Sequence, residues 1–205
     1  MLRLVMGLVM LAGLAACGGN ADLDEAPVPL GDFRLVHNIV IAEKAQRGPL
    51  SRPATEEQLV AAVQGAMAQR FGRYDGASRY HFGVSVEGYV LAQPGVPLVL
   101  APKSVLVINL TVWDDAAVKK LNDEPKQITV LETFGTAPLI GTGYTLTAAE
   151  QLQQLSENAA KAAERYLVQQ RDQEGWFAPD PTAAPVAEPA PDLAADTVGD
   201  ATVTN

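Results

Sequence analysis

The segment Ser104–Trp113, SVLVINLTVW, constrains the fold more than any other stretch of the sequence. It is rich in branched residues and apolar on both of its faces, which is typical of a strand in the centre of a sheet. A central strand needs a hydrogen-bonded neighbour on each side and a packed layer to bury its apolar side chains. We therefore expect a sheet with helices packed against it.

Three further segments supply strands for this sheet. Tyr80–Leu91 alternates apolar and polar residues before the turn AQPGVP, and Gln127–Thr136 returns after the polar connection Asp114–Lys126. Three consecutive strands joined by turns predict an antiparallel meander. Phe33–Ala42, FRLVHNIVIA, also alternates and is expected to be the first strand.

Two segments have helical periodicity. The first follows the capping residue Thr55, is closed by Gly72, and has an apolar stripe at Leu59, Val63, Met67 and Phe71. The second starts at the capping box Thr147–Glu150 and runs to about Arg171, with an apolar face of Leu152, Leu155, Ala159, Ala162 and Tyr166. The order β-α-β-β-β-α predicts an α+β fold: a four-stranded, mainly antiparallel sheet with both helices on one face.

The 205 residues suffice for one domain with appendages, and residues 31–177 are expected to form it. The formal net charge of −9 is concentrated in the two ends, residues 17–30 and 178–205. We expect the first to be a flexible tether and the second a disordered, acidic tail rich in proline and alanine. An acidic chain of this kind is unsuited to bind nucleic acid, which requires a basic surface.

The N-terminal residues 1–16 read as an export signal. Arg3 precedes an apolar run from Leu4 to Ala16, which is too short to span the hydrocarbon core of a bilayer. The run ends in Leu14-Ala15-Ala16-Cys17, and Cys17 is the only cysteine of the chain. These four residues resemble the lipobox of bacterial lipoproteins: an aliphatic residue, two small residues and the acceptor cysteine.

That resemblance implies a lipoprotein signal peptide over residues 1–16 and an acylated Cys17, with diacylglycerol on the sulfur and an acyl chain on the new amino group. No other cofactor is expected. Gly18 follows, rather than the aspartate typical of inner-membrane retention, so the outer membrane is favoured over the inner, with the domain facing the periplasm. The alternative is an ordinary signal peptide with a cysteine there by chance.

The element order behind a lipobox is similar to that of small periplasmic lipoproteins. These include the lipopolysaccharide-assembly lipoprotein, auxiliary lipoproteins of lipid-transport complexes, and families of unknown function. The resemblance covers roughly residues 31–172 and implies partners of three kinds: the membrane through the anchor, other envelope proteins, or lipids.

No set of side chains indicates catalysis or a metal. His37 and His81 lie on different expected strands, without a cysteine or a metal-ligand spacing. GVSVE at 83–87 lacks the second glycine of a nucleophile elbow, and GTGYTL at 141–146 lacks the lysine of a phosphate-binding loop. The acids of the polar connection are expected at a solvated hairpin tip: Asp114, Asp115, Asp123 and Glu124. We expect no enzyme and no metal site.

One cluster has two interpretations. The stretch RFGRYDGASRYHF, residues 70–82, interleaves Arg70, Arg73 and Arg79 with Tyr74 and Tyr80. These five residues form either a patch for an anionic ligand, such as a glycan, a lipid headgroup or an acidic partner, or a helix C-terminus whose arginines complement the dipole and whose aromatics join the core.

Together these features predict a non-enzymatic, lipid-anchored envelope protein that acts as a binding or scaffold module. The alternative is an accessory lipoprotein of a lipid or lipopolysaccharide transport system, which would need an apolar groove between helices and sheet. A wall-acting enzyme is the least favoured hypothesis.

Overall fold

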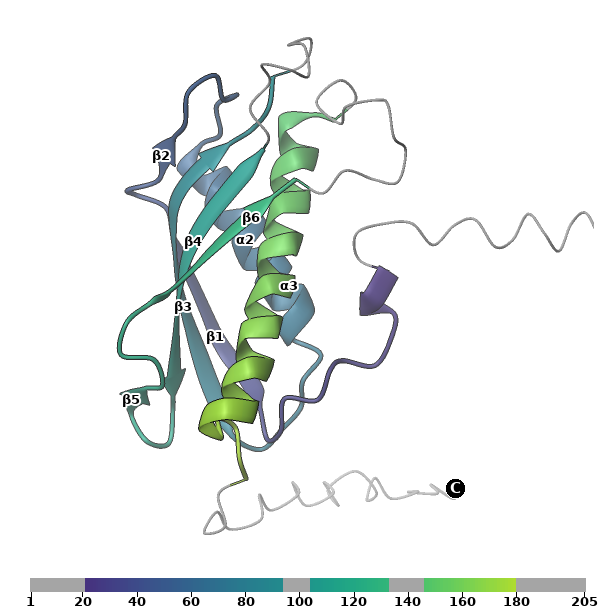
Figure 1. Cartoon of the computed structure of the whole chain (residues 1–205), viewed down its shortest axis with the longest axis vertical. Helices are drawn as coiled ribbons and strands as arrows, with labels where there is room; N and C mark the ends of the chain where they lie inside the picture. Colours follow the sequence, from purple (N-terminus) through teal and green to yellow (C-terminus); the bar gives the residue numbers. More distant parts are fainter. Residues whose placement is uncertain (1–20, 94–103, 133–145, 180–205) are drawn as a thin grey trace, which may run out of the picture.

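The computed structural model describes residues 21–93, 104–132 and 146–179, and shows a mixed sheet with two helices on one of its faces (Figure 1). The elements in chain order are η1 (Ala21–Leu23), β1 (Arg34–Ile41), β2 (Gln46–Arg47), α2 (Glu56–Phe71), β3 (Arg79–Val90), β4 (Val105–Asp114), β5 (Lys119–Lys120), β6 (Lys126–Leu131) and α3 (Ala148–Glu174).

The sheet agrees with the predicted order but is more mixed than predicted. β3 and β4 are central and antiparallel, and β6 pairs antiparallel with β4. β1 pairs parallel with β3, because α2 crosses over the sheet and returns the chain to the same end. Two short strands that the sequence did not reveal extend the edges: β2 beside β3 and β5 beside β4. The expected four strands are therefore six.

Both helices begin where the sequence predicts. Thr55 accepts a hydrogen bond from the Gln58 backbone, and Thr147 accepts one from the Glu150 backbone, each completing a capping box. α3 extends three residues past the expected end, to Glu174, and stops at Gly175, whose φ of +68° is a conformation that favours glycine. Because α3 packs against α2 as well as the sheet, its buried face is broader than predicted and includes Ala163, Glu164 and Leu167.

The strand β4 is central as predicted, but only one of its faces is covered. Leu106, Ile108, Leu110 and Val112 are fully buried beneath the helices. Their neighbours along the strand are half-buried on the opposite face, which no described element covers. This open face of the sheet carries four exposed apolar side chains: Ile39, Ile41, Trp113 and Leu131.

An aromatic cluster closes one end of the core. Phe33 stacks on Tyr80 with ring centroids 5.3 Å apart, and Phe177 contacts both rings edge-on at 4.9 and 4.8 Å. Phe71 and Phe82 pack edge-to-face beside them, 4.9 Å apart. Since Phe177 follows α3 and Phe33 precedes β1, this cluster joins the two ends of the domain.

Candidate anchoring site

Residues Asp22–Leu30, called the strap below, lie against the layer formed by α2 and α3. Leu30 is 1% exposed, the hydroxyl of Tyr74 donates to the Val28 carbonyl at 2.9 Å, and the Arg171 guanidinium donates to the Pro29 carbonyl. The sequence predicted a flexible tether over residues 17–30. In the structure, side chains of the domain bind the backbone of this segment from Asp22 onward.

The strap is held by a cluster of charged and polar side chains, called the clasp below. It consists of Asp22, Arg70, Arg73, Tyr74 and Glu164. Arg70, in the last turn of α2, is only 2% exposed and contacts two carboxylates, Asp22 at 3.0 Å and Glu164 at 2.9 Å. A buried guanidinium is tolerated when its charge and its donors are matched in this way. The clasp therefore joins the strap, α2 and α3.

Arg73 donates hydrogen bonds to the backbone of the strap. Its Nη1 donates to the carbonyls of Leu23 and Glu25, at 3.2 and 3.1 Å, and more weakly to that of Asp22 at 3.4 Å. Its Nη2 lies 3.5 Å from Glu164 Oε1. One arginine thus satisfies carbonyls at the end of the short helix η1 and just beyond it.

The environment of the clasp shifts the pKa values of its members. The hydrogen bond from Arg70, aided by Lys161 at 3.1 Å, lowers the pKa of Asp22 to about 2. Burial opposes the charge of Arg70, but its bonds to Asp22 and its attraction to Glu164 raise the pKa of the guanidinium. Burial, and then the hydrogen bond to Glu164 at 2.8 Å, raise the pKa of Tyr74. The carboxylate and the guanidinium are therefore charged, and the phenol is neutral, at neutral pH.

The five residues suggested as an anionic-ligand patch do not share one surface. Arg70, Arg73 and Tyr74 belong to the clasp, where their partners are carboxylates and carbonyls of the same chain. Tyr80 is buried in the aromatic cluster, and burial raises its pKa to about 12. Arg79 points to the open face of the sheet. The sequence did not indicate Asp22 or Glu164 as partners, because one lies in an expected tether and the other in an ordinary helical pattern.

A second charged group lies on the open face and is called the open-face cluster below: Arg79, Asp115, His81 and His37. Asp115 is 3.2 Å from Arg79 and 2.9 Å from His81 Nε2, and the Nδ1 atoms of the two histidines are 2.7 Å apart. The hydrogen bond from His81 lowers the pKa of Asp115. Within the described ranges no three potential ligands come together in a way that could hold a metal ion.

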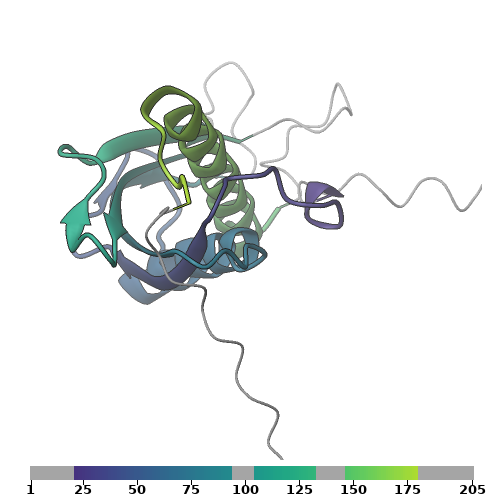
Figure 2. The same cartoon turned by 90° about the horizontal axis from the view of Figure 1, so that it is seen from below.

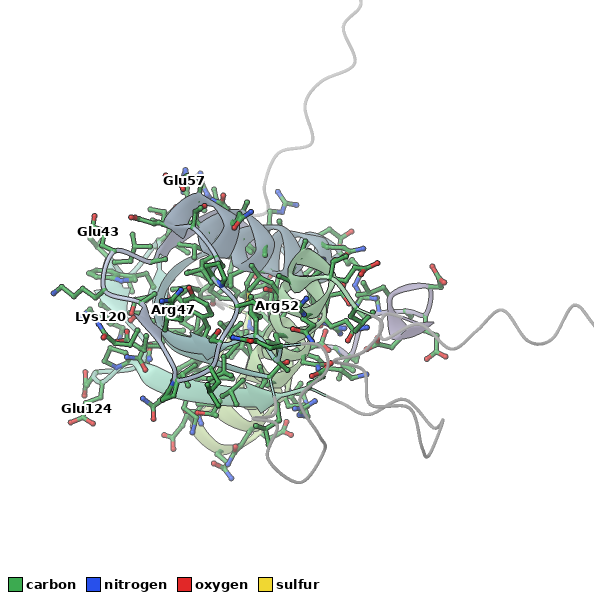
Figure 3. The ribbon with its side chains drawn as sticks, turned by 90° about the horizontal axis from the view of Figure 1, so that it is seen from above. Glu43, Arg47, Arg52, Glu57, Lys120 and Glu124 are labelled. Atoms are coloured by element: carbon green, nitrogen blue, oxygen red, sulfur yellow. The ribbon has the colours of Figure 1, made fainter. Side chains whose placement is uncertain are left out.

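The end of the domain opposite the aromatic cluster holds a pocket of about 370 Å³ between the N-terminal ends of α2 and α3. Figure 3 looks onto this end, with Arg47 and Arg52 near its centre and Glu43 and Glu57 toward its rim. Arg52 donates to the Leu146 carbonyl at 3.1 Å and so joins the segment before α2 to the segment before α3. The pocket is lined by Pro53, Ala54, Gln58, Ala61, Ala62, Leu91, Ala148, Ala149, Leu152 and Gln153. It does not extend between helices and sheet, where Val63, Met67 and Leu155 are fully buried.

Several expectations lie outside the described residues. These are the signal peptide, Cys17, the GTGYT part of the glycine-containing loop, and the tail from residue 180 onward. None of the described helices is both long and apolar enough to cross a membrane.

No protein-family model and no curated protein matches this sequence. Among solved structures it is similar to protein XCC0632 of Xanthomonas campestris, from family DUF330, at 14% identity over 73% of this chain and 94% of that one, with a TM-score of 0.44. A minor lipoprotein of Acinetobacter baumannii matches at 14% identity over 70% and 96%, with a TM-score of 0.35. PelC of Paraburkholderia phytofirmans matches at 10% identity over 65% and 89%, with a TM-score of 0.36. Similarity this low assigns neither a family nor a function.

Proposed function

We propose that this chain is a lipid-anchored protein of the cell envelope, held in the membrane by acyl chains on Cys17 and facing the periplasm. The observation that carries the proposal is the sequence Leu14-Ala15-Ala16-Cys17 at the end of an apolar run too short to span a bilayer. Two or three acyl chains on one residue anchor a protein stably, whereas one chain alone binds only marginally. The outer membrane is the favoured location, since Gly18 follows the cysteine.

The proposed role of the domain is non-enzymatic binding or scaffolding of other envelope components. The open face of the sheet supports this role, because Ile39, Ile41 and Leu131 are each more than half exposed there, at 62, 51 and 52%. Ile39 and Ile41 are near each other on the edge strand β1, and Leu131 lies on the same face on the edge strand β6. Exposed apolar side chains on a shared face favour a surface that binds a partner. The lipid-transport alternative stays a prediction, and co-purification of lipid with the acylated chain, detected by mass spectrometry, is the measurement that would favour it.

The anchor is tested by the Cys17→Ser variant of the full chain, expressed in bacteria fed with labelled palmitate. The wild type is expected to carry label and to sediment with membranes. The variant is expected to carry none and to be retained as the longer, uncleaved precursor. Ala12→Ser, inside the apolar run but outside the lipobox, is the matched control and is expected to behave as the wild type. Label in the Cys17→Ser variant, or an unlabelled wild type, would contradict the proposal.

The binding role is tested separately with a photo-crosslinking residue placed at Ile39 on the open face or at the exposed Gln69 on α2. Crosslinks to envelope proteins are expected from position 39 and not from position 69. Equal crosslinking at both positions, or none at either, would count against the open face as the binding surface.

A further inference from the structure

The distance from Cys17 to the domain is short because the strap is bound. Only five residue steps separate Cys17 from Asp22, the first strap residue held by the clasp. An extended chain advances at most about 3.6 Å per residue, so these two residues can be no more than about 18 Å apart. If the strap were free, the first fixed point would be Asp32, whose carboxylate bonds Ser78 at 2.7 Å, and the limit would be about 54 Å.

The fixed end of this short connection lies on one side of the domain. Asp22 contacts the buried Arg70 of α2 and the part-exposed Lys161 of α3, where the two helices meet. Figures 1 and 2 agree that η1 lies on the side of the helices away from the sheet. The open face of the sheet is on the other side, beyond the full thickness of the helix layer, which is about 10 Å for a helix with its side chains.

From these two facts we propose that the strap holds the helix layer next to the bilayer that contains the acyl chains of Cys17, and keeps the open face of the sheet directed away from it. The proposal rests on the proposed anchor and adds an orientation to it. No attractive patch on the helices is required, because the short covalent connection and the clasp suffice. The surface with exposed Ile39 and Ile41 is then presented to the periplasm instead of to lipid.

The clasp makes this arrangement durable. Breaking it would leave the charge of Arg70, 2% exposed, without one of its two carboxylates. Removing one partner of a buried charge is costly. The length of the connection is therefore set by tertiary contacts and not by the position of the cysteine alone.

The experiment uses the full acylated chain, purified in detergent and reconstituted into phosphatidylethanolamine and phosphatidylglycerol vesicles that carry a nitroxide quencher on the headgroup. Because acylation consumes the sulfur of the only cysteine, a newly introduced cysteine can be labelled with a fluorophore at one position. Gln69→Cys reports on the helix layer, near Arg70, and Thr129→Cys reports on the open face. Quenching is expected to be at least about twofold stronger at position 69, because the two surfaces are separated by a helix and a sheet.

Two insertions test the cause of that difference without touching the clasp. Ten Gly/Ser residues placed between Gly19 and Asn20 lengthen the connection and are expected to abolish most of the difference between positions 69 and 129. The same ten residues placed in the tail, after Asp180, are the matched control and are expected to leave it unchanged. A double variant, Asp22→Asn with Arg73→Gln, is expected to act like the first insertion, with circular dichroism to show that the helices persist.

The outcomes separate the two proposals. If the wild type carries no palmitate and does not stay with the vesicles, the proposed anchor fails. If it is acylated and vesicle-bound but is quenched equally at positions 69 and 129, the proposed orientation is wrong and the anchor stands. The orientation also fails if the Gly/Ser insertion before Asn20 leaves the twofold difference intact.

Discussion

The clasp and the open-face cluster both take their arginines from one stretch of sequence, residues 70–82, yet they lie in different environments. In the clasp, Arg70 and Glu164 are 2 and 7% exposed and hydrogen-bonded on several sides. In the open-face cluster, Arg79 and Asp115 are 56 and 39% exposed. The α2 C-terminus directs the first arginines toward the helix layer, and the alternation of β3 directs Arg79 and His81 to the opposite face of the sheet.

The comparison shows that the contribution of an arginine–carboxylate pair to stability depends on where the pair lies. Water and salt screen the exposed pair, so its formation changes the free energy of unfolding little. The buried pair is not screened. If one member is removed, the other is left as an unpaired buried charge, which destabilises the fold. We therefore expect the two clusters to respond very differently to the same kind of substitution.

The largest effect is expected from Glu164→Gln. This change removes the charge that faces Arg70 and Arg73 and weakens the acceptor of the Tyr74 hydroxyl, so it should lower the free energy of unfolding by about 3 kcal/mol. Urea titration measures the loss. The matched control is Glu157→Gln, two turns earlier on α3, where Glu157 accepts a bond from Gln153, and a change within about 0.5 kcal/mol is expected. Equal losses in both variants would show that the clasp is not special.

A smaller effect is expected from titrating Asp22. Its pKa is about 2 in the folded chain and 3.8 in the reference state, so its ionised form stabilises the fold at pH values above 3.8. That contribution disappears as the pH falls from about 4 towards 2. Side-chain exposure of 30% reduces it to about 1–2 kcal/mol.

The Asp22→Asn variant isolates this contribution, since both proteins keep the other carboxylates whose pKa is lowered, such as Asp32. Urea titrations between pH 6 and pH 2 are expected to show the two stability curves converging below pH 4. Curves that stay parallel over the whole range would contradict the assigned role of Asp22 in the clasp.

The smallest effect is expected from Asp115→Asn in the open-face cluster. The exposed ion pair with Arg79 and the hydrogen bond with His81 are lost, but water replaces both, so the urea midpoint should not change measurably. The ¹⁵N chemical shifts of the His81 ring are expected to change, because the acceptor at Nε2 is no longer a carboxylate. A destabilisation as large as that of Glu164→Gln would remove the distinction between the two clusters.

Local chemistry made the main elements predictable. The caps at Thr55 and Thr147 depend on residues three positions apart, and the alternation of Tyr80–Leu91 is visible in one strand alone. The parallel pairing of β1 and β3 was not predicted, and neither were the two-residue strands β2 and β5, which are too short to show a period. The outward face of β4 was apolar enough to suggest cover, yet the only described helices lie on the other side.

The candidate site was harder to predict, for a specific reason. Arg70, Arg73 and Tyr74 stood out in the sequence, but their partners are separated from them by about fifty residues toward Asp22 and about ninety toward Glu164. A segment rich in proline, glycine and acids resembles a tether whenever its binding surface is not known. Its docking follows from donors on α2 and α3 that no local pattern reveals.

The sequence by itself determined the predicted location in the envelope, through Cys17 behind a short apolar run. It also determined the main secondary-structure elements, namely the capped helices and the strands with their alternating faces. These depend on side-chain chemistry and on spacings of a few residues. The tertiary structure decided which charges are buried and which are solvated, and that Asp22 is bound five residues after Cys17. The reason is that two quantities depend on contacts between residues distant in the chain. These are the effect of a charge on stability and the length of chain that remains free between Cys17 and the domain.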